Sequence, residues 1–336
     1  MEHNNIIISA SPHIHYSQSN EKVMKDVIIA LIPAFLVSVY LFGISSIVIT
    51  SVAIISCVFF EFFIQKYWLH KPISINDYSA ILTGLLLAFN LPSNLPLWMV
   101  VIGSLVAIGV AKMSFGGLGF NIFNPALVGR VFLLICFPVQ MTTWPLPLQN
   151  RWALIDAVTG ATPLGLVKEA TLLSENLTEV SKLLPSNLDL LMGNMGGSLG
   201  EMSAIALLIG GVYLIMRKVI SWHIPITMLF TIFLIAGIFW MYNPDKYLNP
   251  VFHLLTGGAV LGAFFMATDM VTSPMTKTGM IIFAFFIGLI TILIRLFGAY
   301  PEGVSFAILI MNAFVPLINN FSKPKRFGEP IKAKIL

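Results

Sequence analysis

Charged residues are scarce in this 336-residue chain: Asp, Glu, Lys and Arg make up 10% of it, whereas 57% of the residues are hydrophobic. A soluble globular domain carries about 25% charged residues, so this chain has too little charge to cover a surface that faces water. The composition excludes an ordinary soluble enzyme, a nucleic-acid-binding protein and a disordered chain. Because a membrane-spanning helix needs about 20 mostly apolar residues, the length suffices for roughly ten spans.

Cysteine is also scarce, since Cys57 and Cys136 are the only two and both lie within apolar runs. The common iron–sulfur clusters take about four protein ligands, so this chain cannot hold one alone, and we expect both thiols to be packing residues. The first 26 residues are polar and lack the charged, apolar and small-residue order of a signal peptide. We therefore expect the N-terminus to stay in the cytoplasm.

Long uncharged runs predict the fold class, an all-α polytopic membrane protein with about ten transmembrane helices, some of them broken or short. The run from 27 to 60 is too long for one helix, so we expect it to divide near Gly43, and Pro92 and Pro96 interrupt a second run. The remaining helices are expected at about 79–90, 97–113, 125–138, 202–216, 223–241, 252–268, 279–297 and 303–320.

A weak internal repeat divides these helices into two groups of five. The segment Ile81-Leu82-Thr83-Gly84 resembles Leu254-Leu255-Thr256-Gly257, and each begins an apolar run that ends in a proline-bearing break before a full span. Five is an odd number, so the two repeats would be inverted, an arrangement that places binding sites near the bilayer midplane. The alternative is a chance recurrence of Leu-Thr-Gly in apolar sequence. The predicted parts are a cytoplasmic segment (1–26), the first repeat (27–138), an extracytoplasmic insertion (139–200), the second repeat (201–320) and a cytoplasmic tail (321–336).

The positive charges predict the orientation. With ten spans, 14 of the 19 Lys and Arg residues fall on the side of the N-terminus, Lys112 and Arg130 among them. Lys and Arg accumulate in cytoplasmic loops, so both termini are expected in the cytoplasm. The exception to the scarcity of charge is the stretch 151–189, which holds eight charged residues. We expect it to form a small soluble insertion outside the cytoplasm.

The insertion contains the strongest chemical motif, Asp156-Ala157-Val158-Thr159-Gly160-Ala161-Thr162-Pro163. By itself the motif predicts a turn, because Gly160 can adopt positive φ and Pro163 prevents a helix from running through Thr162. The Thr162 hydroxyl follows two small residues on an expected surface loop, which suits a modification site. A plain surface turn is the alternative.

The motif resembles the flavin-attachment motif of a family of membrane proteins, namely the D subunit of the Rnf ion-translocating oxidoreductase complex and the B subunit of the sodium-pumping NADH:quinone reductase. Further segments resemble the same family in the same order: Ser11–His13, Leu82–Leu87, Gly116–Gly119, Asn121–Ala126, Trp222–Pro225, Leu261–Phe265 and Tyr300-Pro301. The compact chain and its Ser-Pro-His segment are closer to the Rnf member. Thr159 stands where the family often has Ser, and Met270 where it usually has Pro.

The resemblance implies two flavins. FMN would be joined through its phosphate to the hydroxyl of Thr162, with Asp156, Thr159, Gly160 and Ala161 completing the motif.

The second flavin implied by the resemblance is a non-covalent riboflavin contacted by Asn121 and Asn124. From the residues alone, Asn124-Pro125 is typical of a helix N-cap and first turn, and a capped helix after a glycine turn is the alternative.

Acidic residues within or beside spans are energetically costly and usually functional. Glu61, Asp77 and Asp269 are the candidates, and Asp269, which follows a broken helix, is the expected member of an ion pathway. The alternatives are a helix end in water for Glu61, a cap of the helix that starts near Ser79 for Asp77, and a helix-end turn for Asp269. No histidine or cysteine spacing predicts a metal site.

The predicted function is that of a flavin-carrying redox subunit in a multisubunit ion-translocating oxidoreductase. It would pass electrons between FMN and the second flavin and couple this to Na⁺ or H⁺ transport. The expected partners are the lipid bilayer of the bacterial cytoplasmic membrane and other subunits, including a second flavoprotein and iron–sulfur subunits, without which it would not be active. The alternative is a channel or secondary transporter without redox chemistry, built on inverted repeats.

Overall fold

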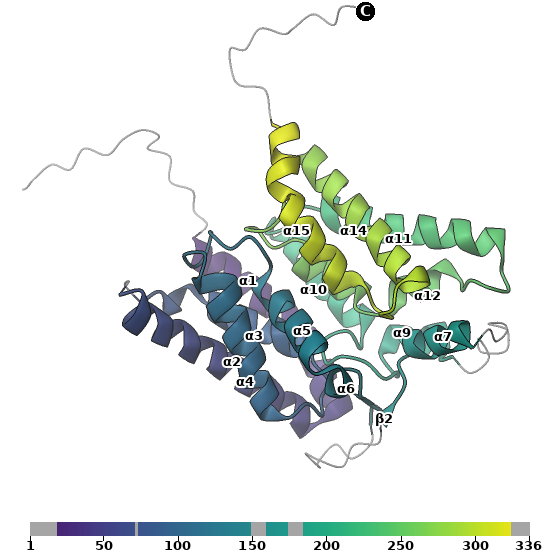
Figure 1. Cartoon of the computed structure of the whole chain (residues 1–336), viewed down its shortest axis with the longest axis horizontal. Coiled ribbons are helices and arrows are strands. Elements are labelled where there is room, and N and C mark those ends of the chain that lie inside the picture. Colours follow the sequence, from purple (N-terminus) through teal and green to yellow (C-terminus); the bar gives the residue numbers. More distant parts are fainter. Residues whose placement is uncertain (1–18, 71–72, 149–158, 174–183, 324–336) are drawn as a thin grey trace, which may run out of the picture.

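The computed structural model describes residues 19–70, 73–148, 159–173 and 184–323. Apolar helices form two groups that lie side by side, with one shorter helix between them (Figure 1). The first group holds α1 (Asn20–Phe42), α2 (Ile44–Phe63), α3 (Ser79–Phe89) and α4 (Leu97–Leu105), which continues as the π-helical η3 (Val106–Met113). The second holds α10 (Ala204–Met216), α11 (His223–Tyr242), α14 (Lys277–Phe297) and α15 (Val304–Phe321). The helix between the groups is α5 (Pro125–Cys136).

Short elements connect these helices. The first half contains η1 (Ile64–Trp68), η2 (Ile75–Asp77) and α6 (Pro138–Met141). The insertion contains β1 (Trp144–Pro145), β2 (Thr159–Gly160), α7 (Pro163–Leu172) and α9 (Asn187–Met192), and the second half contains α12 (Pro250–Leu255), α13 (Ala259–Leu261) and η4 (Gly262–Met266).

Among the described residues, five helices are long and apolar enough to cross a membrane: α1, α2 with η1, α11, α14 and α15. Four further apolar helices are shorter: α3, α4 with η3, α5 and α10. The prolines place two boundaries where the sequence predicts them, since α3 covers 79–89 and α4 with η3 covers 97–113. The helix expected at 252–268 is broken between α12 and α13, where Gly257 and Gly258 both adopt positive φ. The chain is thus mostly helical and multi-pass.

The first helix begins earlier than its hydrophobicity predicts. It starts at Asn20 rather than near residue 27, because the side chain of Ser19 caps it by accepting a hydrogen bond from the backbone N–H of Lys22. Lys25 pairs with Glu21 one turn earlier, at 2.6 Å. The boundary of an apolar run therefore marks where hydrophobicity begins, and the helix itself extends about two turns further.

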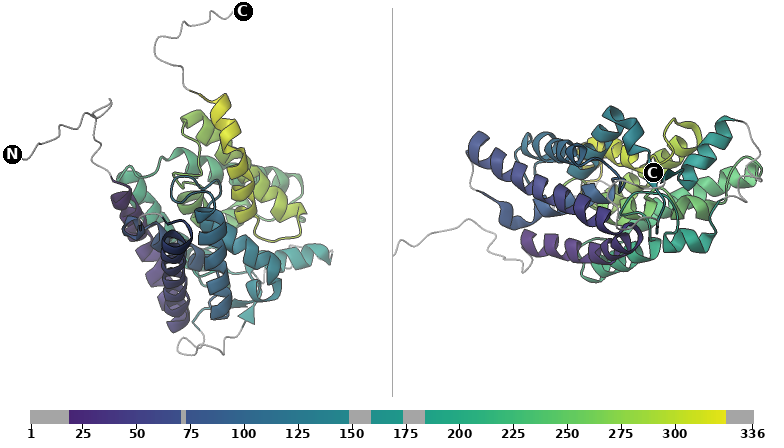
Figure 2. Two further views of the ribbon diagram at one scale, coloured as in Figure 1. Left: turned by 60° about the vertical axis from the view of Figure 1, so that its left-hand side comes forward. Right: turned by 90° about the horizontal axis from the view of Figure 1, so that it is seen from below.

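The two ends of the helix bundle differ. The backbone N–H of Leu148 donates to the carbonyl of Leu41 at 2.9 Å, which places the start of the insertion beside the end of α1. We call this the insertion end. The start of α1 and the end of α15 lie together at the opposite end, here called the terminal end (Figure 2). The ammonium of Lys25 lies 4.6 Å from the ring centre of Tyr78, so α3 also begins at the terminal end.

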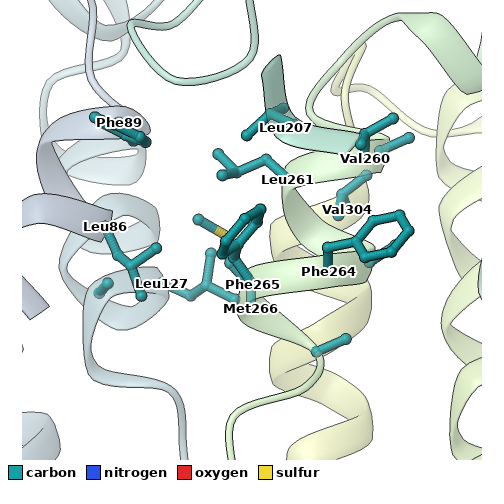
Figure 3. Packing of buried hydrophobic residues seen from close by; sticks show 14 of the residues in the cluster. Leu86, Phe89, Leu127, Leu207, Val260, Leu261, Phe264, Phe265, Met266 and Val304 are labelled. Atoms are coloured by element: carbon teal, nitrogen blue, oxygen red, sulfur yellow. The ribbon is translucent and has the colours of Figure 1, made fainter. Parts of the chain in front are cut away.

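The hydrophobic core joins the two halves. Leu86 and Phe89 of α3 and Leu127 of α5 face Phe265 and Met266 of η4 across the centre of the molecule (Figure 3). The backbone N–H of Gly200 also donates to the carbonyl of Phe89 at 2.8 Å. The short helices of the first half therefore end against the broken helix of the second.

Candidate functional site

Thr162 lies where the short sheet of the insertion meets a helix. Thr159 and Gly160 form β2, which pairs antiparallel with β1 so that Gly160 lies opposite Trp144. Thr162 is the N-cap of α7, and its Oγ1 accepts a hydrogen bond from the backbone N–H of Gly165 at 2.9 Å. The plain turn expected from the motif is therefore a strand followed by a capped helix. Asp156, the first residue of the motif, lies outside the described residues, as does Ser11–His13.

A cavity of about 190 Å³ borders Thr162, and we call it the Thr162 cavity. Three parts of the chain meet there: the insertion, α5 and the segment between α14 and α15. Its lining includes Arg130, Trp144, Thr162, Glu169, Tyr300 and Glu302. Pockets that enclose a drug-sized ligand measure about 300–1,000 Å³, so this cavity holds only part of a larger molecule. Thr162 itself is 7% exposed.

A buried arginine forms one wall of the Thr162 cavity. Arg130 of α5 is 7% exposed, and its Nη1 donates to Ser305 Oγ while its Nη2 donates to the carboxylate of Glu302. Its Nε has no hydrogen-bond partner among the described residues. The charge pattern of the sequence groups Arg130 with the termini, on the side opposite the insertion, whereas its side chain lines the cavity that borders the insertion.

A second buried arginine, Arg295, contacts the backbone of Glu302. The Nε of Arg295 donates to the backbone carbonyl of Glu302 at 2.9 Å, and its Nη atoms donate to the carbonyls of His253 and Thr256 at 2.5 and 2.9 Å. Arg295 thereby satisfies the carbonyls at the end of α12, where the helix breaks. On α7, Lys168 donates to the carbonyl of Arg295 at 3.3 Å, and burial lowers the pKa of this lysine.

Asn121 and Asn124 line a second cavity, of about 80 Å³, which we call the Asn cavity. Gly116, Gly117 and Gly119 precede them with φ of 120°, 105° and 92°, a backbone conformation that only glycine adopts readily. This turn leads into α5, whose N-cap is Asn124: its Oδ1 accepts from the backbone N–H groups of Ala126 and Leu127, at 3.1 and 3.3 Å.

The two asparagines of the Asn cavity differ in how their side chains are satisfied. The Nδ2 of Asn124 donates to the carbonyl of Met266 at 3.3 Å, across the interface between the halves. Asn121 is 5% exposed, and its Nδ2 donates to the carbonyl of Phe123 at 3.2 Å. The Oδ1 of Asn121 has no partner among the described residues. An unpaired buried acceptor is energetically costly, so Asn121 is suited to a ligand that donates a hydrogen bond.

Asp269 also lines the Asn cavity, so three of the predicted site residues meet there. Its Oδ2 accepts a hydrogen bond from the hydroxyl of Thr272 at 3.0 Å. It lies three residues after the end of η4, in the break between that helix and α14. Carboxylate and hydroxyl oxygens are therefore placed together at the end of a broken helix.

One helix connects the two cavities. Asn124, at the start of α5, lines the Asn cavity, and Arg130, six residues later, lines the Thr162 cavity. At 1.5 Å of rise per residue, these positions are about 9 Å apart along the helix axis. The predicted flavin-site residues therefore fall into two groups, one beside the start of α5 and one beside its middle.

Sequence reasoning missed a buried lysine. The Nζ of Lys112, at the end of η3, lies 2.6 Å from Glu61 Oε2 and 2.6 Å from Ser79 Oγ. Its charge predicts a cytoplasmic helix end in water, whereas Lys112 is 2% exposed and lines the Asn cavity. The one available signal was an acid in the neighbouring span, since Glu61 needs a partner if it is buried. Asp77 lies one residue before Tyr78, the N-cap of α3, and its Oδ1 accepts from the backbone N–H of Ser79 at 2.8 Å, so it satisfies a free backbone donor at the start of this helix.

The apolar helices, the broken segment and the polar cavities between the halves define a polytopic membrane protein with buried polar sites. The chain belongs to the NQR2, RnfD, RnfE family, whose model matches residues 7–328. The described residues contain no cluster of three or more His, Cys, Asp or Glu side chains that could hold a metal ion.

Named relatives are subunits of an enzyme complex. The chain is 47% identical over 327 residues, 96% of each chain, to the D subunit of the Na⁺-translocating ferredoxin:NAD⁺ oxidoreductase complex of Acetobacterium woodii. It is also 47% identical over 328 residues, again 96% of each chain, to the D subunit of the proton-translocating ferredoxin:NAD⁺ oxidoreductase complex of Clostridium ljungdahlii. The D subunit of the ion-translocating oxidoreductase complex of Pectobacterium carotovorum is 38% identical over 349 residues, 96% of this chain and 98% of that one. Overall identity thus does not distinguish a Na⁺ relative from a proton relative.

Proposed function

We propose that this chain is the flavin-carrying membrane subunit of a multisubunit ion-translocating oxidoreductase. The observation that carries the proposal is the position of Thr162. Its hydroxyl caps α7 at the edge of a cavity that also holds a buried arginine with an unpaired N–H group. Relatives with whole-chain similarity are named as the D subunits of such complexes.

The residues around Thr162 fit a covalently attached FMN. Thr162 Oγ1 would form a bond to phosphorus, losing its hydroxyl proton and displacing the leaving group of an activated flavin phosphate supplied by a transferase. The N–H groups at the start of α7 favour negative charge beside this oxygen. When bound, the flavin supplies one- and two-electron transfer, and the protein supplies its position and its electrostatic surroundings.

The polar groups that line the Asn cavity suit the second, non-covalent flavin, riboflavin. The unpaired Oδ1 of Asn121 is an acceptor for a ring N–H or a ribityl hydroxyl group, and Asn124 holds the start of α5 in place beside it. A cavity of about 80 Å³ is smaller than a flavin needs, so its side chains move apart when the ligand enters. The six residues from Asn124 to Arg130 span about 9 Å along α5, so the two proposed flavin sites would border the same helix, as the passage of electrons between them requires.

We further propose that Asp269 belongs to the ion pathway. It combines a carboxylate with the Thr272 hydroxyl at a helix break, and it shares the Asn cavity with Asn121 and Lys112. Broken helices near the midplane of inverted repeats are common ion sites. A change in charge at the flavin would therefore act on Asp269 over a short distance, which couples electron transfer to the movement of Na⁺ or H⁺.

The contacts between helices support the proposed ten-helix inverted repeat. In the first half α2 packs against α3 and α4, and in the second half α11 packs against α12 and α14. The first members of the two halves, α1 and α10, contact each other, as do the last members, α5 and α15. The contact between Asp26, near the start of α1, and Arg217, at the end of α10, makes the first pair antiparallel, as inversion requires.

The proposed setting is the bacterial cytoplasmic membrane, with both termini in the cytoplasm and the insertion outside. The FMN on the insertion would receive electrons from a partner flavoprotein or iron–sulfur subunit and pass them to the second flavin. Another partner subunit would then accept them. Among the described residues, no cluster of three or more metal-ligating side chains is present, so iron–sulfur centres in this scheme belong to other subunits.

The test is covalent flavin on Thr162. The chain is expressed in a host that supplies the flavin transferase, and the denatured protein is examined for in-gel fluorescence and for FMN mass on the Thr162 peptide. We expect a fluorescent wild-type band, a dark Thr162→Ala band and a fluorescent Thr162→Ser band. A dark wild-type band, or a fluorescent Thr162→Ala band, would favour the channel or secondary transporter without redox chemistry.

A further inference from the structure

The guanidinium of Arg130 has more hydrogen-bond donors than partners among the described residues. A guanidinium carries five N–H groups in a planar fork that matches a carboxylate or a phosphate. In the described structure the fork contacts Ser305 and Glu302, while Nε, on the same buried side chain, has no partner. A buried unpaired donor is uncommon because it loses its hydrogen bond to water without replacement.

Arg130 and Thr162 line the same cavity. Arg130 comes from α5 and Thr162 from the start of α7, and Glu302 lies between α14 and α15. The cavity therefore collects an arginine, a hydroxyl and a helix N-terminus from three separate parts of the chain. Its volume of about 190 Å³ is too small for a whole flavin, so the phosphate end of the group on Thr162 is the part that fits inside.

Resting on the proposed function, we propose that Arg130 is the phosphate-binding residue of the Thr162 cavity, which holds the phosphodiester on Thr162 Oγ1 in place of the carboxylate of Glu302. Glu302 occupies the fork in the unmodified chain, and a phosphodiester, which carries one negative charge, takes over that position. Ser305 keeps the guanidinium in its plane during the exchange. Arg130 is a positioning residue, because it touches the phosphate and not the flavin ring.

Acidic residues near the cavity oppose the binding of a phosphate to Arg130, because they compete for the guanidinium or repel the negative charge. Glu302 is the direct competitor for the fork, and Glu169 lies exposed at the cavity wall, where water screens it. Glu201 is buried and accepts a hydrogen bond from the backbone N–H of Ser198 at 2.9 Å. Removing the carboxylate of Glu302 therefore helps the phosphate, whereas removing the guanidinium of Arg130 leaves it unpaired among acids.

The experiment compares Arg130→Gln, Arg130→Lys and Glu302→Gln in the full chain, each made with and without the transferase. Two quantities are measured: the FMN attached per chain by intact mass, and the shift in melting temperature between modified and unmodified protein. We expect attachment of FMN to raise the melting temperature of the wild type and of Glu302→Gln. In Arg130→Gln we expect at least a threefold loss of attached FMN and no rise in melting temperature, with Arg130→Lys in between.

The Glu302→Gln variant separates phosphate binding from a merely structural pair. If Arg130 and Glu302 served only to hold α5 against α15, both Gln variants would lose stability alike, and the FMN-dependent shift would survive in Arg130→Gln. That result would overturn the inference, and so would a loss of FMN in Glu302→Gln equal to that in Arg130→Gln. If Arg130→Gln does not fold, the amount of attached FMN is compared between Arg130→Lys and Glu302→Gln. Less FMN in Arg130→Lys supports the inference, and equal amounts overturn it. A wild type without covalent flavin refutes the proposed function itself, which is a distinguishable outcome.

Discussion

The ammonium of Lys112 lies 2.6 Å from the carboxylate of Glu61, and both side chains are at most 2% exposed. The pair joins the end of η3 to α2, and Gln65, one turn after Glu61, donates to the other carboxylate oxygen at 3.3 Å. Two opposite charges thus remain together inside an apolar bundle, beside the Asn cavity.

Removing only one of the two charges by substitution should destabilise the protein more than removing both. An uncompensated buried charge costs about 3–5 kcal/mol, so we expect Lys112→Met alone and Glu61→Gln alone to lower the melting temperature in detergent strongly. The double variant should lie closer to the wild type than either single variant. Additive losses in the double variant would show that the two side chains do not interact.

Alanine variants of Asn121 and Asn124 should distinguish an effect on ligand binding from an effect on helix capping. Asn124→Ala removes an N-cap, which costs about 1 kcal/mol of stability, whereas Asn121→Ala removes no cap. We expect both variants to lose non-covalent flavin at least tenfold, measured as flavin released after acid precipitation. Asn121→Ala should keep the wild-type melting temperature of flavin-free protein. Retention of riboflavin by Asn121→Ala would contradict the proposed role of its Oδ1.

Asp269→Asn tests the ion pathway in the assembled complex. The amide keeps an oxygen for the Thr272 hydroxyl but removes the negative charge. We expect ion transport into proteoliposomes to fall at least tenfold while the content of both flavins stays at the wild-type level. Asp245→Asn, on an exposed turn after α11, serves as the control with unchanged transport. Full transport by Asp269→Asn would exclude this carboxylate from the pathway.

Gly165→Ala should disturb the Thr162 hydroxyl without removing it. A Cβ at this position would lie 3.0 Å from Thr162 Oγ1 and would crowd the oxygen that we propose receives the phosphate. We expect a severalfold loss of attached FMN with α7 still formed. Thr171→Ala, at the far end of the same helix, changes an exposed hydroxyl and should leave FMN attachment unchanged. The measurement is fluorescence per chain on a denaturing gel.

Gly210 should tolerate no side chain, because α10 packs directly on the backbone of α1. An added Cβ would lie 2.0 Å from the carbonyl oxygen of Ala30, and such overpacking costs about 1–3 kcal/mol. We expect Gly210→Ala to lower the melting temperature. Gly237→Ala on α11, where the nearest atom is Pro250 Cγ at 3.5 Å, should leave it unchanged or slightly raised because alanine favours helix. Equal effects would contradict the close contact of α1 with α10.

The helix pattern was largely predictable because apolar runs and prolines act locally. Pro96 and the charged Lys112 mark the two ends of a helix that the structure places at 97–113. The start of α1 was not predictable from hydrophobicity, since Ser19 and the pair of Glu21 with Lys25 extend the helix through polar sequence.

The location of buried charge was not predictable, because it depends on which helices meet. Lys112 has the sequence context of an ordinary helix-end cation and Arg130 lies in the middle of an apolar run, and their partners lie 51 and 172 residues away in the chain. The helix boundary at Thr162 could be predicted from local residues, because Pro163 prevents a helix from running through it. The cavity beside it could not, since α5 and the segment after α14 form most of its other walls.

Because Asn124 and Arg130 lie on the same helix, α5, the number of residues between them fixes how the two cavities are oriented relative to each other. Each residue of an α-helix adds about 100° of rotation, so inserting or deleting one residue between Asn124 and Arg130 turns the guanidinium away from the Thr162 cavity. The loop before Asn124 and the chain after Cys136 can change in length without this penalty. The six-residue interval from Asn124 to Arg130 sets the angle between the two cavities as well as their separation along α5.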